Sequence, residues 1–167
     1  MLPYIQDLRF PYEKKLFLQI QKDPSISGIL SSLSKRHDFT ARKRHLLGSA
    51  VKITKSLIPE LYTLYQTCLD LVGEQLEGEL YVQQQGEYNA SVYAIGNRFD
   101  IVLSSSIVKD FNQEEMAFVI GHELGHVLFD HNKIPVRLIL SDCEQISYEL
   151  ANLLFQWSRT SEISADR

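Results

Sequence analysis

Residues 112–128 read NQEEMAFVIGHELGHVL, and this stretch predicts the helix around which the rest of the fold is organised. Asn112 is a good N-cap and Glu115 follows three residues later, as in a capping box, so we expect the helix to begin near Gln113. Apolar residues then lie nearly all round the helix, which is typical of a helix buried in a core. Its two histidines and its glutamate therefore need polar partners, because buried polar groups are costly without them.

His122 and His126 are four residues apart on this predicted helix. Successive residues of a helix are rotated by about 100°, so both rings project from nearly the same face, one turn apart. Both can reach a single zinc ion at about 2.0–2.1 Å. Glu123 lies at the edge of that face, where a carboxylate can take a proton from a zinc-bound water without binding the metal. The same HExxH pattern also arises by chance, so the prediction depends on a third ligand.

The extended motif HExxHxxGxxH is absent, because Phe129 stands in place of its glycine and Asn132 in place of its last histidine. His131 is no substitute. On a continuing helix its side chain would point about 140° away from that of His126. We therefore interpret His131 as a surface or helix-end residue.

Residues 158–167 read SRTSEISADR and offer a third ligand. Thr160 or Ser161 can cap a new helix that carries Glu162. A carboxylate from this second helix would complete a set of two histidines and one glutamate. The fourth zinc position would stay open for water, as a catalytic site requires.

Asp166 follows Glu162 at the i, i+4 spacing and shares its helix face. We expect its carboxylate to accept a hydrogen bond from the free ring nitrogen of a ligating histidine, His122 in our interpretation. The alternative for both residues is an ordinary solvated face of charges. Together with the HExxH motif, they predict one zinc ion (Zn2+) per chain, bound by His122, His126 and Glu162.

These motifs resemble those of the HtpX-like and CAAX prenyl-protease group of gluzincin metallopeptidases, over about residues 75–167. The matching residues are Gly121 to His126 (GHELGH) with a further His131, Ser158-Arg159 followed by Glu162, Ala165-Asp166-Arg167, and Asn89-Ala90 at the start of a hairpin. The resemblance implies the same three zinc ligands, Glu123 as general base and acid, and Asp166 as a supporting carboxylate. HtpX and the prenyl proteases carry membrane-spanning helices that we do not find here, so the soluble branch is the closer analogy.

We expect an α+β fold: a mostly helical, zincin-type core with a small, largely antiparallel sheet, a zinc-binding helix and a second helix that gives the third ligand. The predicted helices cover residues 4–22, 25–34, 40–55, 59–71, 106–109 and 142–157, and the predicted strands cover 79–82, 91–95 and 99–103. The last two strands should form a hairpin across Gly96 and Asn97. Residues 1–75 are expected to be a helical segment packed on a metallopeptidase core of residues 76–167. That core looks truncated soon after Glu162.

The composition, with 44% hydrophobic and 23% charged residues in 167, fits one compact domain. No apolar run is long enough for a membrane span and no secretory signal is visible, so we expect a cytoplasmic protein without an integral membrane segment. The net charge of −4 gives no footprint for nucleic acid. Cys68 and Cys143 are too few and too far apart for a disulfide framework and are expected to be reduced. No feature specifies an oligomeric state.

The predicted function is zinc-dependent hydrolysis of a peptide or unfolded protein, with a zinc-bound water and Glu123 as general base and acid. Because the resemblance places Asn89-Ala90 at the edge of the sheet, we expect an extended substrate to pair there, along Asn89, Ala90, Ser91 and Val92. The alternative for that segment is a plain structural hairpin. Two alternatives to an active enzyme are a zinc-stabilised regulatory or binding module without catalysis, and an inactive or latent peptidase whose cleft an upstream helix covers.

Overall fold

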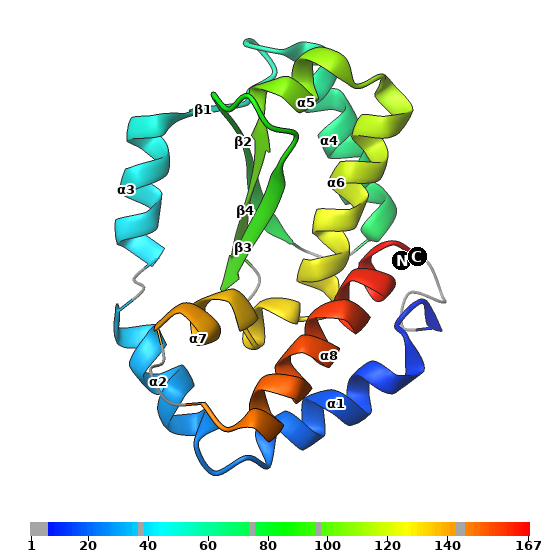
Figure 1. Cartoon of the computed structure of the whole chain (residues 1–167). Coiled ribbons are helices and arrows are strands. Elements are labelled where there is room, and N and C mark those ends of the chain that lie inside the picture. Colours follow the sequence, from blue (N-terminus) through cyan, green and yellow to red (C-terminus); the bar gives the residue numbers. More distant parts are fainter. Residues whose placement is uncertain (1–6, 37–38, 74–75, 96–97, 143–145) are drawn as a thin grey trace.

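The computed structural model describes residues 7–36, 39–73, 76–95, 98–142 and 146–167 (Figure 1). Its helices are α1 (Pro11–Gln21), α2 (Ile26–Arg36), α3 (Phe39–Ser49), α4 (Pro59–Val72), α5 (Ser105–Asp110), α6 (Gln113–Leu128), α7 (Val136–Asp142) and α8 (Tyr148–Ala165), with a 3-10 turn at His131–Lys133. Its strands are β1 (Ala50–Lys52), β2 (Glu77–Gln83), β3 (Ala90–Ile95) and β4 (Arg98–Ser104). The predicted α+β fold class is confirmed.

The four strands form one mixed sheet in the order β1-β2-β4-β3. The predicted hairpin of β3 and β4 is antiparallel, as is the pair β1–β2, whereas β2 and β4 run parallel. The sheet is therefore largely antiparallel, as expected, although the predicted turn at Gly96 and Asn97 lies outside the described residues. β4 is a central strand and is buried almost throughout, whereas β3 is an edge strand.

The two largest groups of buried apolar residues divide the molecule, and a smaller one, formed by Leu46, Tyr81 and Val102, joins α3 to the sheet. The sheet core lies between the sheet and the helices α4 and α6, and consists of Ile53, Leu61, Tyr65, Cys68, Leu80, Phe99, Ile101, Leu103, Ile107, Met116, Ile120, Leu124 and Val127. The helical core joins α1, α2, α7 and α8, and consists of Leu16, Ile20, Ile26, Leu33, Ile134, Ile139, Leu150, Leu154 and Trp157. In Figure 1 the four helices of this second core lie below the sheet, and α3 covers the sheet on the side away from α6.

The signals at the ends of α4 and α6 are confirmed. The Asn112 side chain accepts hydrogen bonds from the first turn of α6 while Glu115 reaches back to the Asn112 backbone, which completes the predicted capping box. Pro59 begins α4, and Gly73 ends it in the left-handed conformation at φ 68°. Among the described residues, no helix has the length and apolar character needed to cross a membrane.

Two predicted helices in the first part of the chain were too long. The helix predicted over 40–55 ends at Ser49, because residues 50–52 pair with β2 instead. This pairing joins Ala50 to Gln83, a tertiary contact that local periodicity does not reveal. The first helix begins at Pro11, since residues 7–10 are not α-helical; residues 1–6 of that prediction lie outside the described part.

The helices after α6 were also divided wrongly. We expected one helix over 142–157 and a new helix capped by Thr160 or Ser161. The structure instead has a single helix, α8, which is capped by the Ser147 side chain and continues to Ala165. The hydroxyls of Thr160 and Ser161 donate to the Trp157 carbonyl within the helix. Serine and threonine side chains can bond in this way inside a helix instead of capping its start.

Candidate metal centre

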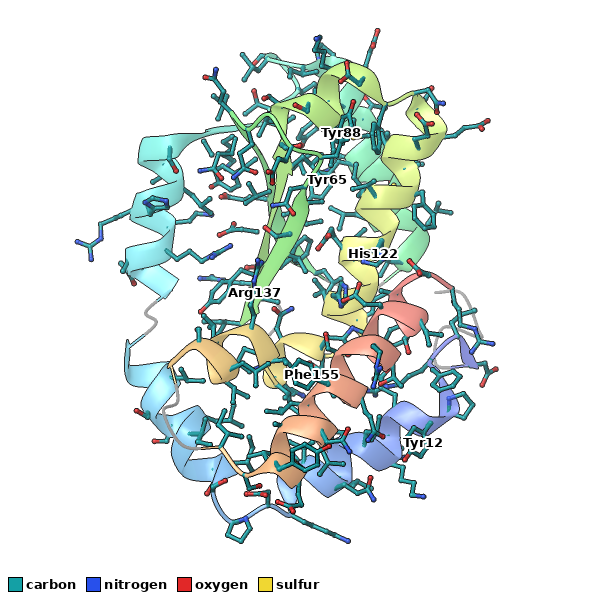
Figure 2. All side chains as sticks on the ribbon, viewed as in Figure 1. Tyr12, Tyr65, Tyr88, His122, Arg137 and Phe155 are labelled. Atoms are coloured by element: carbon teal, nitrogen blue, oxygen red, sulfur yellow. The ribbon has the colours of Figure 1, made fainter. Side chains whose placement is uncertain are left out.

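A close crossing of α6 and α8 brings the predicted ligands together. Gly125 is the contact point on α6: a Cβ atom at this position would lie 3.0 Å from the Ala165 Cα atom and 3.3 Å from its carbonyl oxygen. Glycine therefore lets the two backbones approach more closely than a larger residue would. The crossing places Glu162, one turn before Ala165, beside the exposed edge of the histidine pair on α6. Figure 2 shows His122 on α6 next to the C-terminal end of α8.

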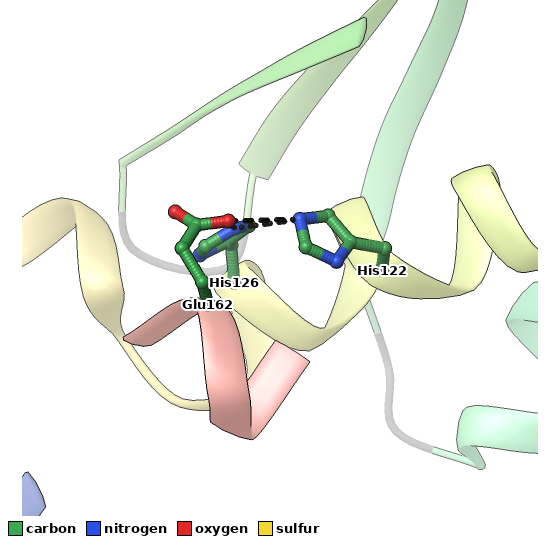
Figure 3. Close-up of side chains that lie close together, drawn as sticks. All are labelled: His122, His126 and Glu162. Carbon is green, nitrogen blue, oxygen red and sulfur yellow. Dashed lines mark hydrogen bonds and ion pairs between the residues drawn. The ribbon is translucent and has the colours of Figure 1, made fainter. Parts of the chain in front are cut away.

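Three donor atoms face one another at this crossing (Figure 3). The Nε2 atoms of His122 and His126 are 3.2 Å apart, and the Glu162 Oε2 atom lies 3.3 Å from the first and 3.7 Å from the second. In the part of the chain that the structure describes, these residues are the one group of three that is arranged to hold a metal ion. The structure therefore brings together all three residues that the sequence analysis selected as ligands.

The dimensions and chemistry of this group suit zinc. Donor atoms at tetrahedral positions about 2.0–2.1 Å from zinc are separated by about 3.3 Å, close to the three distances observed here. Two imidazoles and one carboxylate also form a donor set that zinc accepts in catalytic sites. The group leaves its outer side open, because more than half of the Glu162 side chain is exposed.

The other ring nitrogen of His122 is held by a carboxylate. Its Nδ1 atom lies 2.8 Å from the Asp166 Oδ1 atom, which is the contact that we predicted. Because His122 contacts the carboxylates of Glu162 and Asp166, its pKa rises to about 9 despite the opposing effect of burial. The contacts of Glu162 with the two histidines hold the pKa of its carboxyl well below the usual range.

Glu123 lies beside the donor group and is not part of it. The residue is buried, with 6% of its surface exposed, and burial raises the pKa of its carboxyl although His126 and His122 oppose the shift. The Val92 backbone also hydrogen-bonds to this carboxyl. Glu123 is thus held between the histidine pair and the edge strand β3.

His131 is not the surface residue that we expected. The helix α6 ends at Leu128, and Asp130 adopts a left-handed conformation at φ 59°, so extrapolation of the helix to residue 131 fails. The chain turns back, and His131 is buried with its Nδ1 atom 2.7 Å from the Nδ1 atom of His126. Burial lowers the pKa of His131.

Glu13 on α1 is a residue that the sequence analysis missed. It is fully buried, and its Oε2 atom lies 3.3 Å from the Nε2 atom of His131. The Arg9 Nε atom lies 2.5 Å from its Oε1 atom, and the Ser164 hydroxyl donates to its Oε2 atom. Burial would raise the pKa of Glu13, but these contacts hold it below the usual range. One signal was available in the sequence, because Glu13 shares a helix face with the apolar residues Leu16 and Ile20.

The four predicted substrate-binding residues lie at the start of the edge strand. Ala90, Ser91 and Val92 belong to β3 and pair with Leu103, Val102 and Ile101 of β4. The main chain of Asn89 is already occupied: its carbonyl accepts from the Ser104 N–H, and its own N–H donates to the Ser104 hydroxyl.

Two comparisons with known proteins found relatives of this chain. Residues 57–141, which include α6, match the peptidase family M48. The chain is also similar to the plastoglobule-localized metallopeptidase 48, chloroplastic, of Arabidopsis thaliana, with 24% identity over 171 residues that cover 96% of this chain. The chain spans about half (49%) of the length of that relative. No solved structure matches the chain. Peptidases of family M48 are in general zinc-dependent metallopeptidases, and this chain belongs to that family.

Proposed function

We propose that this chain is a zinc-dependent metalloendopeptidase of the HtpX-like gluzincin type. The observation that carries the proposal is the arrangement at the helix crossing: three converging donors from α6 and α8, and next to them a buried carboxylate that does not join them. A purely structural zinc site has a closed ligand set and needs no such carboxylate.

In this proposal His122, His126 and Glu162 hold the zinc ion. When bound, zinc would supply Lewis acidity, which polarises the scissile carbonyl and makes a water molecule a good nucleophile near neutral pH. Asp166 accepts a hydrogen bond from the Nδ1 atom of His122, so it fixes the orientation of that ring and directs Nε2 toward the donor group.

Glu123 is the proposed general base and acid. Its carboxyl would take a proton from the attacking water and then pass it to the leaving amine nitrogen, so that the cycle returns the carboxylate unchanged. The raised pKa of Glu123 suits a group that must both accept and release a proton. The hydrogen bond from Val92 holds one side of the carboxyl and ties it to β3.

The substrate would bind along β3 as an added strand. In an antiparallel pair, alternate residues turn their main-chain groups toward and away from the partner strand. Because the Val92 N–H donates to Glu123, every second residue of β3 turns its main-chain groups away from β4. Ala90 and Ala94 would therefore offer both main-chain groups to a substrate, and Val92 would offer its carbonyl. A peptide paired there passes next to Glu123. For Asn89, only the side chain is available to the substrate.

The test is hydrolysis of an unfolded protein, casein, by purified protein of known metal content. Wild type should contain about one zinc ion per chain and cleave casein, and removal of zinc by a chelator should stop cleavage until zinc is restored. Glu123→Gln should bind zinc as the wild type does but lose cleavage, because its amide cannot accept the proton. Glu149→Gln, on the exposed first turn of α8, is the matched control and should cleave normally.

The outcomes separate the alternatives. Wild type that binds no zinc at neutral pH would overturn the metal site. Equal cleavage by wild type and Glu123→Gln would overturn the role of Glu123. Zinc binding without any cleavage would favour the regulatory module or the latent peptidase.

A further inference from the structure

We propose that Glu13 is a positioning residue of the metal site, which acts on the ligand His126 through His131. The inference rests on the proposed function, and it deepens that function by assigning a role at the site to α1. This helix lies outside the part of the chain that matches the family.

The donor and the acceptor in each contact follow from the groups at the two ends of this path, the metal-binding nitrogen of His126 and the carboxylate of Glu13. The Nε2 atom of His126 belongs to the donor group, so it must be unprotonated to bind a metal. The ring then carries its proton on Nδ1, which donates to the Nδ1 atom of His131, 2.7 Å away. A neutral His131 that accepts at Nδ1 must carry its own proton on Nε2.

That second proton meets Glu13. The Nε2 atom of His131 is buried and has no partner with hydrogen-bond geometry among the described residues, but it lies 3.3 Å from the Glu13 Oε2 atom, which is the acceptor within reach of its proton. A carboxylate only accepts hydrogen bonds, so Glu13 favours the tautomer of His131 that leaves Nδ1 free to accept from His126.

Glu13 is itself held in place. Arg9, which lies just before α1, and the Ser164 hydroxyl on α8 both bind its carboxylate, which makes its burial tolerable. Arg9 also donates from Nη2 to the Phe129 carbonyl, 3.0 Å away at the end of α6. The carboxylate is therefore fixed against α1, α8 and the end of α6 at once.

A merely structural role makes a different prediction. If Glu13 only docks α1 onto α8, its loss should lower the stability of the protein without changing the zinc affinity of the folded protein. The two roles are separated by measuring the zinc dissociation constant, in competition with a chelator, beside the unfolding midpoint of the metal-free protein.

The experiment uses the full chain and four single variants. Glu13→Gln keeps the shape of the side chain but removes its charge, and Glu13→Asp keeps the charge but shortens its reach. His131→Phe removes both ring nitrogens. Leu16→Ala is the matched control, because Leu16 is equally buried on α1 but belongs to the helical core and has no hydrogen-bonding group in its side chain.

We expect His131→Phe to weaken zinc binding by about 10–100-fold, as the loss of an outer hydrogen-bond partner does, and both Glu13 variants to weaken it by about tenfold. Leu16→Ala should lower the unfolding midpoint but leave the zinc dissociation constant within about twofold of wild type. In the His131→Phe background, Glu13→Gln should cause no further loss of zinc affinity, because both residues act through one hydrogen bond.

A zinc dissociation constant that is unchanged in both Glu13 variants, measured against a zinc-binding wild type, would overturn this inference and leave the proposed function intact. Additive losses in the double variant would overturn the path through His131. Wild type that binds no zinc would overturn the proposed function, and this inference with it. If Glu13→Gln does not fold, the Glu13→Asp variant decides between the outcomes.

Discussion

The sheet core and the helical core make different contributions to the candidate metal centre. From the side of the sheet core, α6 supplies two histidines and the buried Glu123 within five consecutive residues. From the side of the helical core, α8 and α1 supply only carboxylates, which are far apart in the sequence: Glu162, Asp166 and Glu13. One core thus carries a local motif, and the other completes it from a distance.

The family match covers the local motif and stops before α8. Residues 57–141 contain α4, the strands β2 to β4, α5, α6 and all of α7 except its last residue, but not α8. A compact motif is visible in a short stretch of sequence, whereas a single glutamate on a separate helix is not. If the two cores contribute as described, zinc binding should depend on the helical core as strongly as on the HExxH motif.

The most direct test of this difference removes the ligand that the helical core supplies, Glu162. In Glu162→Gln a neutral amide replaces an anion beside a divalent cation, so zinc affinity should fall by more than the roughly 100-fold that marks the upper range for outer residues. Isothermal titration with zinc would measure it. Glu149→Gln on the same helix should leave the affinity unchanged. An unchanged affinity in Glu162→Gln would mean that the third ligand lies elsewhere.

A smaller effect is expected for Asp166, which contacts His122 instead of the proposed metal position. Asp166→Asn should weaken zinc binding by about 10–100-fold, because the amide accepts a weaker hydrogen bond from the histidine ring. The same titration would show it. A loss as large as that of Glu162→Gln would indicate that Asp166 is itself a ligand.

The pH dependence of zinc binding tests whether the two carboxylates act on His122. In the metal-free protein the ring stays protonated up to a pKa of about 9, so protons compete with zinc below that value. Apparent zinc affinity should rise by about tenfold per pH unit on approach to pH 9 and then level off. In Glu162→Gln the zinc affinity should level off at a lower pH, because the pKa of His122 loses the contribution of the Glu162 carboxylate.

The same shift predicts how the stability of the metal-free protein depends on pH. Because folding raises the pKa of His122 above its usual value of 6.5, the stabilisation is complete below pH 6.5 and is lost as the pH rises through about 9. Thermal unfolding at several pH values would measure it. A midpoint that increases between pH 6.5 and 9 would contradict the assignment to His122.

The smallest change in zinc affinity is expected at Gly125, where the two cores touch. Gly125→Ala places a methyl group against the Ala165 backbone and should lower stability by about 1–3 kcal/mol through overpacking, with a modest loss of zinc affinity. Gly121→Ala is the matched control on the same helix. It has no neighbour within 4 Å, so it should gain up to about 1 kcal/mol from helix propensity. Equal changes in stability and zinc affinity in the two variants would mean that α6 and α8 can move apart at their crossing without cost.

Local signals in the sequence predicted much of the sheet core. The capping box of α6, the proline and glycine that bound α4, and the hairpin of β3 and β4 all rest on contacts within a few residues or on strong alternation. The strand β1 was mistaken for helix because only three residues, Ala50–Lys52, pair with β2, a contact made across some thirty positions. Nothing local marks such a contact.

The sequence predicted the three candidate ligands and Asp166, but it did not predict the buried pair of His131 and Glu13 behind them. The spacing of His122 and His126, and of Glu162 and Asp166, is helical, so periodicity placed each pair on one face. His131 was misplaced because one left-handed residue, Asp130, reverses the chain after α6. Glu13 was overlooked because its meaning depends on a contact with α8, which the sequence does not display.

The contact of α1 with Ser164 also has a consequence for synthesis of the chain. The Phe10 N–H and the Glu13 carboxylate both bind the Ser164 hydroxyl, across 154 and 151 residues. At translation rates of about 5–20 residues per second, α1 must wait roughly 8–30 s on the ribosome before α8 exists to cover it. During that interval Leu16 and Ile20 have no partner from α8, so the nascent chain presents an apolar helix face that a chaperone can bind. The helical core's share of the metal centre would therefore form later than the local structure of α6, because it depends on contacts between residues about 150 positions apart.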